Sequence, residues 1–116
     1  MIFNPGQSAG IIDKTLPDAK IKLGKIKFAY DNIGRACPGL TADERDRLNK
    51  IIKAKYPAEA NQRAIEWKHR SGVSVGTSFR GGTVQMLHVS EFGDIALRRP
   101  QDAKDIITGA LPALAQ

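Results

Sequence analysis

The sequence has little cysteine and little histidine, and this scarcity excludes two classes of small protein. Cys37 is the only cysteine among 116 residues, and His69 and His88 are the only histidines. One cysteine cannot form an internal disulfide, and these three side chains do not have the spacing of a Cys/His metal cluster. Disulfide-stabilised scaffolds and zinc modules are therefore excluded.

Long apolar runs are also missing. No uninterrupted apolar stretch approaches the roughly 18 residues that a membrane helix needs, and residues 1–6 lack the basic, apolar and small-residue regions of a secretory signal. We therefore expect no membrane contact and a cytoplasmic location. The composition is 41% hydrophobic and 26% charged. At this length, such a composition predicts one folded domain over residues 1–116.

The chain is basic, with 18 Lys and Arg against 12 Asp and Glu and a net charge of +6. Residues 1–60 carry 11 basic and 7 acidic residues, and residues 61–116 carry 7 and 5, so the excess is spread over both halves. Basic proteins attract polyanions, chiefly nucleic acid, but spread charge is weaker evidence than a concentrated patch. A solvated basic surface is the other interpretation.

Strand and helix patterns alternate along the first half of the chain. The short apolar run at residues 9–12 predicts a buried strand, and Pro17 behind Thr15 is typical of a helix start. Gly34 is expected to end that helix. Residues 41–44, Thr-Ala-Asp-Glu, fit a capping box and predict a second helix.

The first helix has apolar residues on two faces. Five of them recur at helical spacing and should share one stripe: Ala19, Leu23, Ile26, Tyr30 and Ile33. Ile21 and Phe28 project from nearly the opposite side. Two interpretations stay open: the helix is covered on both faces within the domain, or Ile21 and Phe28 are covered by a surface that this chain does not itself contain. The second interpretation predicts self-association and thus a possible homo-oligomer.

The second half is rich in short strand patterns. Residues 64–67 and 73–77 are β-prone runs separated by a turn-like segment, which indicates a hairpin or two neighbouring strands. Residues 84–89 form the most apolar stretch and are expected to be a buried strand. Pro100 opens a last helix. The order β-α-α-β-β-β-α predicts an α/β fold, a layered sheet with flanking helices in which parallel strands are mixed with a hairpin.

Residues 87–91, Leu-His-Val-Ser-Glu, place an acidic residue directly after an apolar strand. In P-loop ATPases such a strand delivers a polar residue that holds Mg²⁺ through water and a Glu that polarises the attacking water. Glu91 has the position of that carboxylate. Ser90 replaces the usual Asp and carries no charge, so its affinity for the metal should be lower. Because apolar runs ending in Glu are common, a purely structural strand end also fits.

A family resemblance is carried by residues 76–93, which read Gly-Thr-Ser-Phe-Arg-Gly-Gly-Thr-Val-Gln-Met-Leu-His-Val-Ser-Glu-Phe-Gly. This segment, with Pro100 and residues 107–111 behind it, resembles the ATPase domain of tailed-phage terminase large subunits, the motors that package viral DNA. In that family an Arg-Gly-rich turn precedes the acidic strand, and "LH(I/V)SEFG" recurs in one branch. Residues 10–13 and the helix after them look like the segment that follows the first nucleotide-binding helix.

The resemblance extends over roughly residues 9–111 and implies roles for three of them. Glu91 would be the catalytic carboxylate and Ser90 the residue that holds Mg²⁺ through water. Arg80 would sense charge or contact the transition state, although a surface ion pair is its other interpretation. Gly81 and Gly82 would let the backbone pass close to its neighbours.

Two further side chains have structural interpretations. Trp67 is expected to pack in the core or the hairpin instead of serving as a platform for stacking bases. His88, on the alternate face of an apolar strand, is expected to be a buried structural residue and not an acid or base.

The sequence departs from the family at the phosphate site. The chain has no G-x-x-x-x-G-K-[ST] motif, whose backbone amides and Lys cradle a triphosphate, and residues 6–10 contain glycine without that Lys. The segment that couples hydrolysis to movement and the acidic nuclease domain are also missing. The chain thus resembles a partial ATPase domain. ATP and Mg²⁺ serve the intact family, and this chain is expected to bind neither tightly.

These features lead to rival functions. The first is a fragment of a phage or prophage terminase large subunit, involved in ATP-driven DNA packaging and inactive alone, with double-stranded DNA and other packaging subunits as partners. The second is a stand-alone, non-catalytic nucleic-acid-binding or interaction protein built on the same fold remnant. The third is an inert prophage relic. The flanking DNA distinguishes them, because a terminase gene would encode a phosphate loop upstream and a nuclease downstream.

Overall fold

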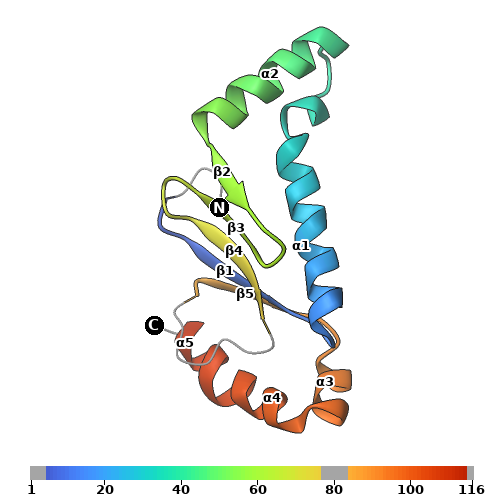
Figure 1. Cartoon of the computed structure of the whole chain (residues 1–116), viewed down its shortest axis with the longest axis vertical. Coiled ribbons are helices and arrows are strands. Elements are labelled where there is room, and N and C mark those ends of the chain that lie inside the picture. The colour runs from blue at the N-terminus through green and yellow to red at the C-terminus, as the bar shows by residue number, and fades with distance from the viewer. Residues whose placement is uncertain (1–4, 77–83, 115–116) are drawn as a thin grey trace.

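Five strands form one mixed sheet with helices on both faces (Figure 1). The computed structural model describes residues 5–76 and 84–114. Its strands are β1 (Ser8–Ile12), β2 (Ala58–Ala60), β3 (Ala64–Trp67), β4 (Gly72–Gly76) and β5 (Met86–Val89). They lie in the order β2-β3-β4-β1-β5. β1 is parallel to β4 and β5, whereas β3 is antiparallel to β2 and β4. The predicted α/β class is confirmed.

The helices fall into two groups. α1 (Leu16–Asp31) and α2 (Ala42–Lys55) are joined through the 3₁₀ turn η1 (Gly34–Ala36). After the sheet follow α3 (Phe92–Arg98), α4 (Pro100–Asp105), the π-helical segment η2 (Ile106–Ala110) and α5 (Leu111–Leu114). Among the described residues, no helix combines the length and the apolar content that crossing a bilayer requires.

α1 begins and packs as its sequence predicts. The Thr15 side chain caps the helix by accepting a hydrogen bond from the Asp18 amide at 3.2 Å. The buried residues of the helix pack on Ile11, Val75 and their neighbours in the sheet. Trp67 is 5% exposed in this core, and its ring meets that of Tyr30 edge-on with centroids 5.6 Å apart. The prediction that Trp67 belongs to the core is confirmed.

The opposite face of the sheet carries a second core. Because successive side chains of a strand point to opposite faces, Ile11 faces α1 while Ile12 faces the C-terminal helices. Ile12 packs there against Ile95 and Ile106, with Leu87 at the margin. β1 is thus covered on both faces, as expected for the centre of a parallel arrangement.

The strand at residues 84–89 differs from its prediction, because β5 is an edge strand of the described sheet and is buried on one face only. Its Leu87 and Val89 pack on the C-terminal helices. Met86 is 62% exposed and His88 is also exposed, since α1 lies over β1, β3 and β4. The predictions of a buried strand and of a buried His88 are therefore wrong.

The outer face of α1 is uncovered. Ile21 is 61% exposed and Phe28 is 71% exposed, so no described part of the chain covers them. The interpretation in which the helix is covered on both faces within the domain is therefore wrong. The helices also reach beyond the sheet, which gives a radius of gyration of 16.3 Å, whereas a compact domain of this length has about 13 Å. Coverage of Ile21 and Phe28 by a second copy stays a prediction.

Candidate functional site

The carboxyl ends of β1 and β5 meet at one edge of the sheet, because the two strands are parallel neighbours. Asp13 follows β1, and Ser90 and Glu91 follow β5. The Ser90 amide donates a hydrogen bond of 2.8 Å to the carbonyl of Ile12, so the pairing continues to the last residue before Glu91. In open α/β sheets, ligands bind outside this edge. We therefore regard it as the candidate site.

Asp13 is a buried carboxylate at this edge, with 2% of its surface exposed. One oxygen pairs with the Lys22 ammonium from α1, and the other accepts a hydrogen bond of 2.7 Å from the Lys14 amide. Burial alone would raise the pKa of Asp13, but the Lys22 and Lys14 hydrogen bonds and the charges of both lysines hold it below its usual value. Asp13 is therefore ionised and joins β1 to α1.

Arg99 fixes the same corner from the C-terminal side. It lies between α3 and α4, where its Nη2 donates to the Asp13 carbonyl at 2.7 Å. Its Nη1 pairs with Asp102 in the first turn of α4 at 2.9 Å. The guanidinium thus connects the end of β1 to the helices that cover the second core, and it holds the backbone of Asp13 in place.

Glu91 has a backbone conformation that glutamate rarely adopts. Its φ of 57° and ψ of 43° are left-handed, a conformation that costs a non-glycine residue on the order of 1 kcal/mol. Strain of this kind is concentrated at functional sites. Glu91 is exposed, and its carboxylate makes no hydrogen bond or ion pair to the described residues. This places an open carboxylate at the edge of the sheet.

Ser90 is already engaged with a neighbour. Its hydroxyl lies 2.6 Å from Nε2 of His88, which is two residues earlier, in β5. The tautomer of His88 decides which group donates. The hydroxyl is therefore shared between this hydrogen bond and any ligand at the edge.

The residues at this edge do not fit a magnesium site by themselves. Mg²⁺ is usually held by one or two carboxylates together with substrate phosphates. Asp13 is paired with Lys22, and Ser90 is neutral and hydrogen-bonded to His88. Of these three residues at the edge, Glu91 therefore supplies the one charged oxygen donor that is open to a metal. Within residues 5–76 and 84–114, no three His, Cys, Asp or Glu side chains are grouped to hold a metal.

Comparison of the chain with protein-family models, with curated proteins and with solved structures gives no match in any of the three. The resemblance to terminases therefore rests on the sequence segments alone, and function has to be argued from the site.

The structure describes two of the predicted site residues and does not describe the others. Ser90 and Glu91 lie at the carboxyl end of a strand, but that strand is at the edge of the described sheet and not at its centre. Arg80, Gly81 and Gly82 lie outside the described residues.

Sequence reasoning missed three residues of the site: Asp13, Lys22 and Arg99. A signal was present for Asp13, because an acidic residue directly after a buried strand lies at the same edge as Glu91. The other two reach the edge only through the packing of helices on the sheet, which no local pattern reveals.

The ion pair between Asp13 and Lys22 gives a prediction for stability. Replacing Lys22 by methionine leaves the buried carboxylate without its cation, and we expect a loss of about 1–3 kcal/mol at pH 7. The lower end of this range applies because the Lys22 side chain is 36% exposed, so that solvent screens its attraction to Asp13. Lys25→Met, at an exposed position of the same helix, is the control and should change stability by less than about 0.5 kcal/mol.

The same pair predicts a dependence on pH. Because the folded-state pKa of Asp13 is lowered, the pair stabilises the fold above the ordinary value of 3.8, and this contribution is lost as the pH falls through the lower folded value. In Lys22→Met the cost of burying the charged Asp13 is no longer offset by the ammonium. Acidification, which protonates Asp13, should therefore narrow the difference in the free energy of unfolding between this variant and the unmodified chain. Urea unfolding at neutral and acidic pH measures both effects. An unchanged difference across that range would show that the two groups do not interact.

Proposed function

We propose that this chain is part of a nucleotide-hydrolysing motor of the terminase type, in which it supplies the acidic side of the ATPase site. The observation that carries the proposal is Glu91, an open carboxylate held in a left-handed conformation at the carboxyl edge of a parallel sheet. The sequence of residues 76–93, which leads into and past Glu91, supports the same function. Its setting would be the cytoplasm of a bacterial host or a phage-infected cell.

In this function Glu91 would orient the attacking water and accept its proton. Ser90 would touch the same water network through its hydroxyl, which already bonds to His88. Asp13 would not take part in the chemistry, because Lys22 neutralises it. Its role, with Arg99, would be to keep the end of β1 in a fixed position beside Glu91.

The phosphates would be held by a segment outside these 116 residues. For Glu91 to act on a water next to the terminal phosphate, the cradle has to lie at the same edge of the sheet and beside β5. β1 already occupies one side of β5, and no described strand pairs with the other side. Unpaired edges are ready to accept a strand. A strand that leads into the phosphate cradle therefore fits the open edge of β5.

The alternative function is a non-catalytic nucleic-acid-binding or interaction protein. It is favoured by a different observation, the position of the basic residues, which is developed in the next subsection. The two functions predict different results with nucleotide.

The chain alone is expected to bind ATP with Mg²⁺ more weakly than about 1 mM, because backbone amides and a lysine of the cradle make most contacts to a triphosphate. Titration calorimetry measures this directly. The DNA that flanks the gene should encode the phosphate loop, and the flanking segment expressed together with this chain should hydrolyse ATP. Micromolar binding by the chain alone, or flanking genes that encode no nucleotide-binding segment, would contradict the proposal.

A further inference from the structure

The positive charge is concentrated in one part of the fold, which a division of the chain into halves conceals. Residues 45–76 carry eight basic and three acidic residues, a net charge of +5, whereas residues 1–44 carry six and five and residues 77–116 carry four and four. Five of the six net charges therefore belong to the segment that forms most of α2 and the strands β2, β3 and β4. Both halves of the chain carry part of the excess, as noted above, because this segment extends on both sides of residue 60.

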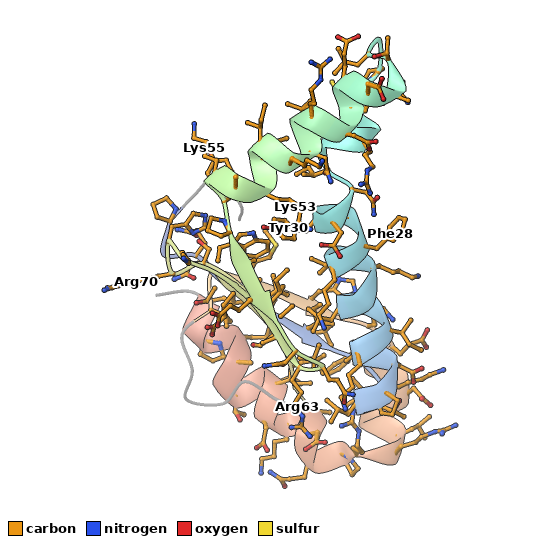
Figure 2. All side chains as sticks on the ribbon, turned by 45° about the horizontal axis from the view of Figure 1, so that its top comes forward. Phe28, Tyr30, Lys53, Lys55, Arg63 and Arg70 are labelled. Atoms are coloured by element: carbon orange, nitrogen blue, oxygen red, sulfur yellow. The ribbon has the colours of Figure 1, made fainter. Side chains whose placement is uncertain are left out.

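Part of this charge surrounds a hollow where α2 ends. The hollow has a volume of about 430 Å³ and is lined by residues of two chain segments: Ala54, Lys55, Tyr56, Pro57, Lys68 and His69. The two segments are joined by a hydrogen bond of 3.1 Å from the Lys68 amide to the Pro57 carbonyl. Arg70 lies two residues further along the same turn, and Figure 2 shows Lys55 and Arg70 on the same side of the molecule.

The turn between β3 and β4 holds two of these cations rigidly toward solvent. The Trp67 amide donates to the Ser71 carbonyl at 2.8 Å, and the Arg70 amide donates to the Trp67 carbonyl at 3.0 Å. Arg70 has a left-handed φ of 70°, which completes the tight turn. Lys68 and Arg70 are both exposed.

These cations are not neutralised by the described residues. Lys55, Lys68 and Arg70 form no ion pair there, and the Lys55 ammonium lies over the Tyr56 ring, 5.7 Å from its centroid. Lys53, two residues earlier in α2, is by contrast paired with Asp31 at 2.8 Å. Two acidic residues, Glu59 in β2 and Glu66 in β3, occupy opposite positions in the strand register and do not line this hollow, although Glu66 lines the neighbouring hollow with Arg70. Lys55 and Lys68 thus line this hollow, and Arg70 follows Lys68 on the same turn, so three cations without an ion pair to the described residues lie on adjoining surface.

We propose that Lys55, Lys68 and Arg70 form a binding surface for the phosphate backbone of double-stranded DNA. Uncompensated cations on a rigid frame attract phosphates without reading sequence. The aromatic residues of the hollow, Tyr56 and His69, contact each other edge-on with centroids 6.2 Å apart, and Lys55 lies over the Tyr56 ring, so the rings are not arranged as a row of stacking platforms for unpaired bases. No large exposed apolar residue lines the hollow, so insertion into a membrane is not supported. The surface does not depend on the proposed ATPase function.

The test is binding of the full chain to a labelled duplex of about 30 base pairs, followed by fluorescence anisotropy at several salt concentrations. Three phosphate contacts predict a slope of about −3 for log affinity against log salt. The triple variant Lys55→Gln, Lys68→Gln, Arg70→Gln should bind at least about ten-fold more weakly and lose two to three units of slope.

The matched control is Lys20→Gln, Lys25→Gln, Lys104→Gln, which removes the same three charges elsewhere and leaves the same net charge of +3. It should weaken binding by less than about three-fold. Thermal melting checks that both variants fold, since Lys55 also compensates the carboxyl end of α2.

Equal weakening in the two variants would mean that bulk charge, not this surface, binds the duplex. Tighter binding to a single strand of the same length, or to phosphatidylserine vesicles, would overturn the proposal. Since the assay contains no nucleotide, its failure would leave the proposed ATPase function unaffected.

Discussion

Glu91→Gln is expected to lower ATP turnover by about 10²–10⁴-fold in the motor assembled from this chain and the segment that carries the phosphate cradle. The amide keeps the size of the side chain but cannot take a proton from the attacking water. Nucleotide affinity should stay the same, because the cradle binds the phosphates and Glu91 does not. Steady-state turnover and nucleotide titration on the same preparation separate the two effects.

Two companion variants make this result specific. Glu59→Gln removes another exposed carboxylate, in β2 away from the candidate edge, and should leave turnover unchanged. Glu91→Gly should lower turnover as Glu91→Gln does, while stability is kept or rises by up to about 1 kcal/mol, because glycine adopts the left-handed conformation without strain.

The catalytic assignment is tested by the opposite outcomes. If Glu91→Gln unfolds the chain, Glu91 is a structural residue. If it leaves turnover untouched in the assembled motor, another group activates the water.

Local features of the sequence predicted local features of the fold. The capping box at residues 41–44 is present with both of its hydrogen bonds, from the Glu44 amide to the Thr41 hydroxyl at 3.2 Å and from the Thr41 amide to the Glu44 carboxylate at 3.3 Å. The groups that make these bonds lie within four residues, so the pattern contains all the information needed. Strands β3 and β4 were found for the same reason, because a short turn joins them.

Features that depend on pairing between segments far apart in the chain could not be predicted from the sequence. The apolar run at residues 84–89 has the composition of a central strand, but its position in the sheet depends on which strands pair with it, and β1 lies more than 70 residues earlier. β2 has only three residues and no β-branched side chain, and it forms because β3 pairs with it. A strand of this kind leaves no signal of its own.

The same distinction between local and distant features applies to the candidate site. Glu91 was predicted as a candidate because one motif contains both its strand and its carboxylate, and the structure places it after that strand. The ion pair between Asp13 and Lys22 forms because α1 crosses the end of β1, and the bond from Arg99 spans 86 residues. Both contacts are products of packing, so sequence patterns with periods of two or 3.6 residues could not reveal them.

The turn between α1 and α2 is where we expect the largest effect on stability. Gly34 is buried, and its amide donates a hydrogen bond of 2.9 Å to the side chain of Asn49 in α2. Asn49 is 4% exposed and donates in turn to the Asp31 carbonyl at the end of α1, at 2.7 Å. The backbones of the turn and of α2 therefore approach closely, and this contact fixes the angle between the two helices.

Gly34→Ala should destabilise the fold by about 2–3 kcal/mol, because a Cβ atom at this position would overlap the backbone nitrogen and Cα of Asn49 and lie 2.8 Å from the carbonyl carbon of Leu48. A backbone cannot move aside as a flexible side chain does, so α2 would have to shift and break both Asn49 hydrogen bonds. Gly24→Ala is the matched control, since a Cβ atom there meets nothing within 4 Å and the position lies inside α1. That variant should gain about 0.5–1 kcal/mol. Urea unfolding of both variants measures the contrast, and a Gly34→Ala chain as stable as the Gly24→Ala chain would show that the helices do not approach as closely as this turn requires.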